Sequence, residues 1–445
     1  RTKSKKFYNS IKYYPISRHI HTNFGNKENL IKYNHSRTTG PEPCVCHAPL
    51  RSLYFDMKGN ITACCFNRVH IFGKYPQKNI KEIIYNEKRE FLQKELCRQN
   101  FMYGCQHCHK LIEAQNFEGV EAKLYDNLKD QGNIPSEMVF ELDNTCNLAC
   151  EMCHEGFSST IAKLKGIEIP AHPYDADFLA QLKEFIPHLK IAKFLGGEPF
   201  LINIYYQIWD LILELNPNCK IHLQTNGTVF NEKIESYLRK GRFYIGVSID
   251  SLRKENYEKI RRNANFDKVM ENLYRFAEIA KQRNTFINIS VCPMIQNWEE
   301  ITEIVDFCNK NSFFVYFNTV YTPGFSLRDA DEDFLLKIKD YYKNFKFYTK
   351  GIIAKRNLKF FNNLTSQIED IYNQKEKDSR YEKKRHKWTN SMLKEFMFKK
   401  INNDKELLEK IDDVFLNLGE EYSFSDKDLE NLEKLKVEDL ISALK

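Results

Sequence analysis

Short apolar segments alternate with amphipathic segments over residues 136–325. The apolar segments are rich in Val, Ile and Phe, which is typical of buried parallel strands. The predicted strands are residues 138–142, 190–195, 219–224, 243–249, 286–292 and 313–320. The predicted helices are residues 157–165, 175–187, 201–214, 230–239, 254–281 and 298–310. Such alternation indicates parallel βαβ units, so we expect an α/β fold in which six units form a partial, TIM-like (β/α)6 barrel.

The segment before the barrel predicts a small domain over residues 44–125. Two short alternating runs, residues 52–56 and 61–66, flank the turn signal Lys58-Gly59-Asn60 and predict a β-hairpin. Helix-like sequence follows over residues 80–97. We therefore expect a β-hairpin and helices here, ahead of the barrel.

The segment after the barrel, residues 326–445, is charged and predicts a mainly helical extension. The mixed-charge run 375–387 indicates a solvated helix face or a linker, with a basic substrate-binding patch as the alternative. Residues 423–444 carry Ser and Asp ahead of periodic Leu, which predicts a capped amphipathic helix.

Residues 1–43 form a basic N-terminal arm. The first 40 residues carry nine Lys or Arg and one acid, Glu28. Such an arm is a surface segment, a remnant of an organellar presequence or a contact for an acidic partner. The net charge of +7 says little about partners by itself. No apolar run approaches the length of a membrane span, so we expect no membrane partner.

Thirteen cysteines are many for a chain of this size. They lack the spacing of a small secreted framework, and several fall into closely spaced patterns that suit metal binding. We therefore expect a reducing compartment, the cytoplasm, with an organellar matrix as the alternative because of the basic arm.

Three cysteines follow the first predicted barrel strand directly. Cys146, Cys150 and Cys153 have the spacing C-x3-C-x2-C. Iron–sulfur clusters are usually held by four thiolates, so a group of three leaves one iron without a protein ligand. An open position of this kind is what a metal site needs to bind a reactant. The alternative is a zinc knuckle completed by His154.

Polar and glycine residues follow the next three predicted strands. They are Gly196, Gly197, Glu198 and Pro199, then Thr225 and Asn226, then Ser248 and Asp250. The C-terminal strand ends of such a barrel carry its chemistry. The two glycines permit close backbone approach to a ligand, and Glu198 offers a carboxylate for an ammonium group. Taken alone, Asn226-Gly227 could be only a turn and Glu198-Pro199 only a helix start.

Together and in this order, these motifs resemble the radical SAM superfamily. The resemblance implies that Cys146, Cys150 and Cys153 hold a 4Fe–4S cluster whose open iron binds S-adenosylmethionine (SAM). It implies that residues 196–199 hold the SAM amino group and that the elements around residues 225–226 and 248–250 also bind the cofactor. Many members have, just before the last cysteine, an aromatic residue whose backbone contacts adenine. This chain departs from that pattern, because Met152 stands at this position.

The resemblance also implies a mechanism. An external one-electron donor such as flavodoxin or ferredoxin reduces the cluster, SAM is cleaved to a 5′-deoxyadenosyl radical, and the radical abstracts hydrogen from the substrate. The protein orients and shields this chemistry.

A second cysteine set lies in the predicted N-terminal domain. The hairpin carries Cys46 and Cys64, and a C-x2-C pair supplies Cys105 and Cys108, so four thiolates can surround one site. This pattern resembles the SPASM/twitch domain of radical SAM enzymes, placed before the barrel instead of after it, and implies a second, auxiliary 4Fe–4S cluster. A zinc ribbon on the same four residues is the alternative. Cys44, Cys65 and Cys97 are alternative ligands.

The sequence specifies the substrate less well than it specifies the fold or the cofactors. Relatives with auxiliary clusters often modify ribosomally made peptides, so we expect a peptide or protein substrate, with a small molecule such as a sugar or nucleotide as the alternative. A non-catalytic iron–sulfur protein is a competing hypothesis. We do not favour nucleic acid as a partner. An RNA-modifying enzyme stays a further alternative because Lys3, Lys5 and Lys6 are basic.

Overall fold

The computed structural model describes residues 27–128, 131–382, 386–400, 421–424 and 433. The chain divides into two compact units, one of residues 24–370 and one of residues 1–23 with 371–445. The N-terminal part of the predicted basic arm, residues 1–26, lies outside the described residues.

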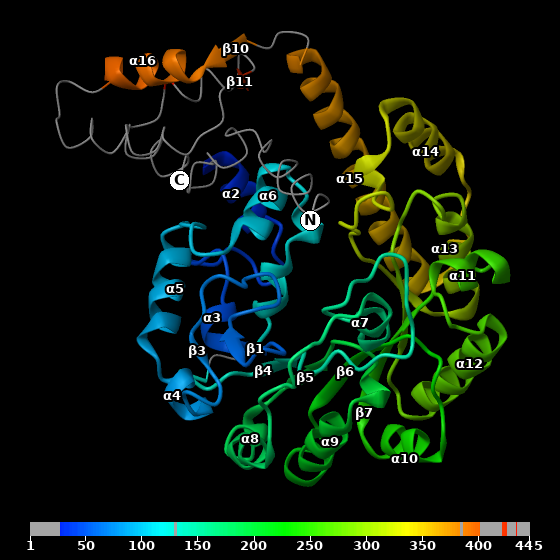
Figure 1. Ribbon diagram of the computed structural model, residues 1–445. Helices are drawn as coiled ribbons and strands as arrows, with labels where there is room; N and C mark the ends of the chain where they lie inside the picture. Colours follow the sequence, from blue (N-terminus) through cyan, green and yellow to red (C-terminus); the bar gives the residue numbers. More distant parts are fainter. Residues whose placement is uncertain (1–26, 129–130, 383–385, 401–420, 425–432, 434–445) are drawn as a thin grey trace. The chain divides into compact units, whose positions relative to one another are not determined.

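A nine-stranded sheet in the order β3-β2-β1-β4-β5-β6-β7-β8-β9 organises residues 24–370 (Figure 1). Its strands are β1 (Ser52–Phe55), β2 (Asn60–Thr62), β3 (Gly73–Lys74), β4 (Glu137–Phe140), β5 (Ile191–Phe194), β6 (Lys220–Thr225), β7 (Arg242–Ser248), β8 (Ile287–Val291) and β9 (Phe314–Phe317). Strands β4 to β9 pair in parallel and in sequence order. The six predicted barrel strands are therefore confirmed.

Helices connect the parallel strands in the predicted positions, except that the single helix expected over residues 254–281 is two helices, divided after Ile260. They are α7 (Ser159–Lys165), α8 (Ala176–Leu182), α9 (Asn203–Leu215), α10 (Glu232–Lys240), α11 (Lys254–Ile260), α12 (Phe266–Gln282) and α13 (Glu300–Asn311). Figure 1 shows α8, α9, α10 and α12 in a row along the sheet. Helix α9 illustrates the packing, because Tyr205, Ile208, Trp209 and Ile212 recur at helical spacing and are all buried. The Trp209 ring lies 5.5 Å from that of Phe194 on β5.

The predicted hairpin is present, and it extends the barrel sheet. Strands β1 and β2 are antiparallel, and β1 also pairs in parallel with β4, with Leu53 opposite Met138 and Phe55 opposite Phe140. Strand β2 ends at Thr62, so the prediction of a strand through residue 66 is wrong there. Cys64 and Cys65 consequently lie in the turn after β2. Their side chains therefore need not point alternately to the two faces of the sheet, as they would in a strand.

Short helices surround the hairpin. They are α2 (Lys27–His35), α3 (Ala48–Arg51), α4 (Ile80–Ile84), α5 (Glu87–Cys97), α6 (Gln106–Glu113), and the 3-10 helices η2 (Phe117–Gly119) and η3 (Glu121–Tyr125). Buried Arg89 on α5 donates hydrogen bonds to the carbonyl oxygens of Pro49, Leu50, Ile84 and Asn133. One guanidinium therefore satisfies four backbone acceptors from three separate segments.

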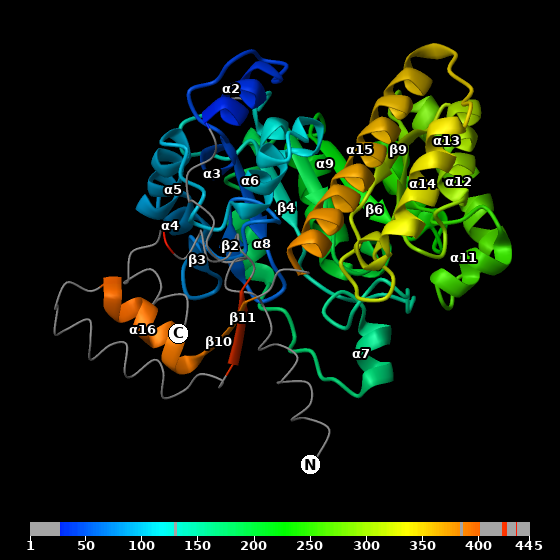
Figure 2. The same ribbon diagram turned by 90° about the horizontal axis from the view of Figure 1, so that it is seen from above.

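Helices α14 (Glu332–Asn344) and α15 (Gly351–Glu382) follow β9. Figure 2 shows α15 beside β9, where Asn357 Oδ1 accepts a hydrogen bond from Val315 N at 3.0 Å. The helix thereby covers the edge strand, whose outer backbone groups lack a strand partner.

The unit that contains residues 371–445 holds two strands that the sequence pattern did not predict. Strand β10 (His386–Thr389) pairs in antiparallel with β11 (Glu421–Phe424), and α16 (Asn390–Lys400) follows β10. The described part of the mixed-charge run is helical up to Glu382 and lies in β10 from His386. The predicted helix from Ser423 is wrong at its start. Apart from residue 433, the rest of that helix lies outside the described residues. In the described ranges, no helix is both long and apolar enough to cross a membrane.

Candidate active site

The loop after β4 carries all three cysteines of the C-x3-C-x2-C motif, and the start of α7 holds it. Ser159 Oγ accepts a hydrogen bond from Cys146 N at 3.0 Å, and Thr160 Oγ1 donates to Cys146 O at 2.7 Å. Ser158 Oγ donates to Leu148 O at 2.7 Å. The hydroxyl groups of the N-cap Ser158 and of the first two residues of α7 thus fix the cysteine loop.

Two distant segments hold the other side of the loop. Ala149 N donates to Arg262 O at 3.0 Å and Glu151 N donates to Ile260 O at 2.9 Å, which pairs the loop with the end of α11. Thr322 Oγ1, after β9, donates to Met152 O at 2.7 Å. The backbone carbonyl of Met152 is therefore engaged by the protein.

The three thiols lie close enough to influence one another. Burial, together with the neighbouring Cys150 thiol, raises the pKa of Cys146 to about 11 and that of Cys153 to about 12. Within the described ranges, no three His, Cys, Asp or Glu side chains converge tightly enough for a single metal ion. The thiolates of an iron–sulfur cluster bind different irons, so their sulfur atoms need to lie near one another but not around a single metal ion. Three coupled thiols on one loop fit that group.

Two side chains direct N–H groups at the cysteine sulfurs. Asn226 Nδ2 lies 3.9 Å from Cys146 Sγ, and Arg261 Nη1 lies 3.7 Å from Cys150 Sγ. Arg261, in a basic pair directly after α11, was missing from the sequence prediction, and that local pattern did not mark it as a site residue. Such donors stabilise thiolate charge.

Asp250 positions this arginine. Its side chain is fully buried, Oδ2 lies 2.7 Å from Arg261 Nε, and Oδ1 accepts from Cys292 N at 2.7 Å. Burial raises the pKa of Asp250, while the Arg261 cation opposes that rise. Both carboxylate oxygens thus face protein groups, and direct binding of a cofactor by Asp250 stays a prediction.

The Gly-Gly-Glu-Pro segment packs against the backbone that precedes Cys146. Gly197 N donates to Asp143 O at 3.0 Å and Glu198 N donates to Thr145 O at 2.7 Å. A Cβ atom at Gly197 would overlap Thr145 O, and Gly196 has a φ of +108°. We expected these glycines to admit a ligand, but here they admit the backbone of residues 143–145.

Glu198 joins this segment to the end of β6. Its carboxylate accepts from Thr225 Oγ1 and from Asn226 N, both at 2.7 Å, and from Phe200 N at 3.2 Å. Glu198 is 0% exposed, and burial raises its pKa to about 7. The carboxylate is occupied by protein donors, so its binding of an ammonium group stays a prediction. Pro199 is buried at the start of the 3-10 helix η5 (Pro199–Leu201).

Polar side chains also link the ends of β6, β7 and β8. Gln224 Nε2 donates to Ser248 Oγ at 2.8 Å, and Ser290 Oγ donates to Gln224 Oε1 at 2.7 Å. Asn226 Nδ2 further donates to Asn147 Oδ1 at 2.9 Å, which ties β6 to the cysteine loop. Ser248 and Asn226 therefore lie where the sequence analysis expected them, on adjoining strand ends.

The second cysteine set shares one cavity. Cys46, Cys64, Cys105 and Cys108 all line it, among apolar walls that include Leu92. Burial raises the pKa of each thiol, and the other thiols of the set raise the pKa values of Cys46, Cys105 and Cys108 further. These four cysteines were grouped from their spacing in the sequence, and in the structure they line one cavity.

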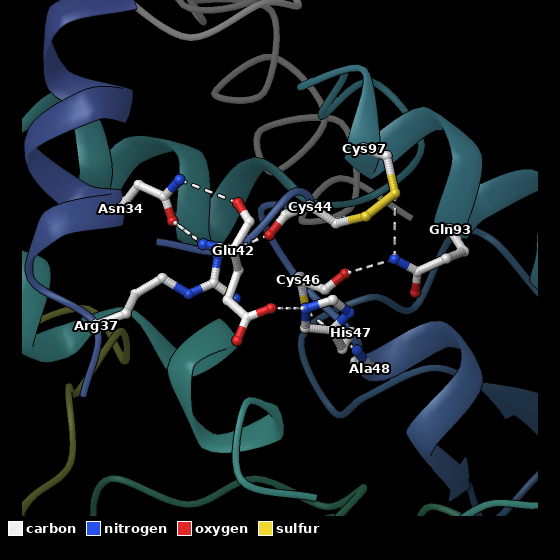
Figure 3. The surroundings of a disulfide bond; sticks show 9 residues. All are labelled: Asn34, Arg37, Glu42, Cys44, Cys46, His47, Ala48, Gln93 and Cys97. Carbon is white, nitrogen blue, oxygen red and sulfur yellow. Dashed lines mark hydrogen bonds and ion pairs between the residues drawn. A yellow bond between two sulfur atoms is a disulfide. The ribbon is translucent and has the colours of Figure 1, made fainter. Parts of the chain in front are cut away.

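The alternative ligands are placed elsewhere. Cys44 and Cys97 form a disulfide bond with each other (Figure 3), and Cys65 is not among the residues that line the cavity. The disulfide corrects the expectation that closely spaced cysteines here are thiols or metal ligands. Its partners are 53 residues apart, so no local spacing marked them as a pair.

Comparison with known proteins agrees with these motifs. Residues 141–308 match the sequence profile of the radical SAM superfamily. The chain is 26% identical over 185 residues to a probable GTP 3′,8-cyclase of Archaeoglobus fulgidus, covering 41% of this chain and 58% of that protein. It is 29% identical over 192 residues to a cysteine-type anaerobic sulfatase-maturating enzyme of Clostridium novyi, covering 39% of this chain and 49% of that protein.

Among solved structures, native anSMEcpe with bound AdoMet has 22% identity and a TM-score of 0.37, covering 47% of this chain and 60% of that one. Streptococcus suis SuiB bound to precursor peptide SuiA has 20% identity and a TM-score of 0.35, covering 62% of this chain and 57% of that one. In each comparison, the chain spans less than two thirds of the relative.

The matched segment runs from the end of β4 into α13 and includes the cysteine triad and the three strand-end motifs that follow it. Over residues 141–308, this chain therefore resembles the radical SAM superfamily.

Proposed function

We propose that this protein is a radical SAM enzyme that abstracts hydrogen from a peptide or protein substrate. The observation that carries the proposal is a hydrogen-bonded assembly around the cysteine loop. Asn226 after β6 and Arg261 after α11 contact Cys146 and Cys150, and the segment after β5 binds the backbone that precedes Cys146. Cys146, Cys150 and Cys153 would hold a 4Fe–4S cluster with one open iron. Cluster and SAM together supply a 5′-deoxyadenosyl radical when bound.

The described residues have clear tasks in such a site. Arg261 and Asn226 place N–H groups beside cysteine sulfurs, which favours the thiolate form that binds iron. Glu198 holds the ends of β5 and β6 together beneath the cysteine loop. Buried, hydrogen-bonded polar groups at strand ends keep the site rigid and exclude water, which a reactive radical requires.

The auxiliary site belongs to the same proposal. Cys46, Cys64, Cys105 and Cys108 would bind a second 4Fe–4S cluster, and their shared cavity supports this assignment. Four protein thiolates leave no open iron, so that cluster would transfer electrons or support the structure. A zinc ribbon on the same residues is the competing assignment.

The substrate class rests on the relatives. Similarity to a cysteine-type anaerobic sulfatase-maturating enzyme favours a protein substrate, whereas similarity to probable GTP cyclases keeps a nucleotide as the second candidate. A short precursor-peptide gene beside this one would favour the first. Specific binding of GTP by the reconstituted protein would favour the second.

The proposed partner is a low-potential one-electron carrier such as a flavodoxin or ferredoxin. A reducing compartment, cytoplasmic or organellar, would keep the cluster ligands as thiols. The chain's basic balance of +7 is compatible with an acidic carrier.

Anaerobic reconstitution tests the proposal. The protein is loaded with iron and sulfide, reduced with dithionite and mixed with SAM, and 5′-deoxyadenosine is measured. We expect product from the wild type and none from Cys150→Ala. If the loaded wild-type protein forms no 5′-deoxyadenosine, the catalytic proposal is wrong.

A further inference from the structure

The Cys44–Cys97 disulfide lies directly beside the proposed auxiliary site. Cys44 is two residues before Cys46, and Cys97 is the last residue of α5 (Figure 3). Val45, Cys46 and Leu96, which are neighbours of the two disulfide partners, all line the four-cysteine cavity. The bond therefore joins two walls of that cavity.

The two ends of the disulfide differ in access to solvent. Cys44 is buried with 7% of its surface exposed, whereas Cys97 is exposed. A thiolate from outside attacks the sulfur that it can reach, and the buried sulfur is then the leaving group. Cys97 is thus the more accessible of the two partners and the expected point of attack.

A single side chain contacts both the disulfide and a proposed ligand. Gln93 Nε2 donates to Cys46 O at 3.0 Å and lies 3.6 Å from Cys97 Sγ. Both contacts are visible in Figure 3. A change at Cys97 therefore reaches the Cys46 backbone through one amide group.

We infer that Cys44 and Cys97 form a thiol–disulfide redox site that controls how firmly the auxiliary site holds its iron. This inference rests on the auxiliary cluster of the proposed function. The co-reactant is a dithiol. Its thiolate attacks Cys97 Sγ, the sulfur–sulfur bond breaks, and Cys44 leaves and takes a proton. The second thiol of the reductant then releases Cys97 as a thiol and becomes the reductant's own disulfide, so two electrons and two protons pass to the protein.

Reduction would loosen the Cys46 segment without releasing it. Hydrogen bonds remain from Val45 N to Leu96 O at 3.2 Å, from Tyr33 Oη to Val45 O at 3.1 Å and from Arg37 Nη1 to Cys44 O at 2.6 Å. Arg37 is itself fixed by a buried ion pair with Asp126. The segment keeps its place on average, but it opens more often once the covalent bond is gone, and a ligand that opens more often exchanges its iron faster.

Iron release measures this effect directly. Anaerobically reconstituted protein with the disulfide intact, the same protein after treatment with the phosphine TCEP, and the variant C44S/C97S are each mixed with an iron chelator. We expect iron to leave the auxiliary site several-fold faster from the reduced protein and from the variant than from the disulfide form. Release from the barrel cluster, which has no contact with this bond, serves as the internal control.

The possible outcomes distinguish failure of the redox inference from failure of the proposed auxiliary cluster. TCEP should not alter release from C44S/C97S, since that variant has no disulfide to reduce. Equal auxiliary release rates from the disulfide and reduced wild-type forms would overturn the inference, as would mass spectrometry that finds Cys44 and Cys97 alkylated as free thiols in protein isolated without reductant. If every form binds only the barrel cluster, the auxiliary cluster itself is refuted instead.

Discussion

Arg261 Nη1 lies 3.7 Å from Cys150 Sγ, and Asp250 fixes the same guanidinium through an ion pair of 2.7 Å at Nε. A cation held beside one thiolate of a redox cluster stabilises the reduced, more negative state. This relationship makes Arg261 a positioning residue whose effect is measurable even before the substrate is known.

Arg261→Met should lower the reduction potential of the barrel cluster. A hydrogen bond to a charged group contributes about 1.5 kcal/mol, which corresponds to a shift of roughly 60 mV for a one-electron couple. An EPR-monitored redox titration checks this, with Arg253→Met as the control because the exposed Arg253 pairs with Glu303 instead. An unchanged potential with full iron content would show that Arg261 does not tune the cluster.

Two cysteine variants should remove different clusters. Cys150→Ala should abolish SAM cleavage and remove about four of roughly eight irons, whereas Cys105→Ala should remove the auxiliary irons and spare the barrel cluster. Iron and sulfide analysis with EPR of each variant checks this. Loss of all iron from Cys105→Ala would argue against two separate sites.

Gly197→Ala should disrupt the site because its Cβ would collide with Thr145 O in the backbone before Cys146. We expect a loss of at least about 2 kcal/mol in unfolding free energy and loss of SAM cleavage. Gly324→Ala is the matched control, since a Cβ there meets open space and only the positive φ costs about 1 kcal/mol. Equal stability of the two variants in denaturant unfolding would contradict the close packing at Gly197.

Glu198 should make the apo-protein less stable as pH rises. Its pKa is raised by burial to about 7 in the folded protein from 4.5, so the folded state binds the proton more tightly than the unfolded state. The stabilising contribution of the protonated Glu198 is fully present below pH 4.5 and is lost as pH rises through about 7. The free energy of unfolding falls by about 3 kcal/mol in total over this range. Unfolding of the wild type and Glu198→Gln at both ends of this range measures it. A pH dependence that persists unchanged in Glu198→Gln would assign it to other groups.

Asn357→Ala should destabilise the barrel edge. Asn357 accepts from Val315 N and donates to Asn309 Oδ1 and Phe313 O, so its removal leaves buried groups unpaired. We expect a loss of about 2–3 kcal/mol, seen as a lower midpoint of thermal or denaturant unfolding. Asn362→Ala, on an exposed face of α15, should be nearly neutral. Equal effects would show that α15 does not cover β9 through this side chain.

The sequence predicted the barrel well because its strands and helices alternate over short distances. The six strands and the motifs at their ends all follow from local periodicity and from residues such as Gly196 and Asp250 placed after apolar runs. What it could not predict depends on contacts between distant residues. The pairing of β1 with β4, the strands β10 and β11, and the Cys44–Cys97 disulfide all join segments that carry no signal of one another.

Within the site, residue types were predicted better than their tasks. Gly197 and Glu198 were expected to face a ligand, which stays a prediction. Their contacts within the chain, which join the β5 loop to the cysteine loop and to β6, were not predicted. Arg261 was missed because a basic residue after a helix is common, and only the fold brings it to Cys150.

The central claim is that one iron at Cys146, Cys150 and Cys153 has no ligand from the protein. EPR of the anaerobically reduced protein, recorded with and without SAM, tests it most directly. The account predicts that SAM changes the signal of one 4Fe–4S cluster and that this change is absent in Cys150→Ala. An identical spectrum with and without SAM in protein that carries the barrel cluster would contradict it.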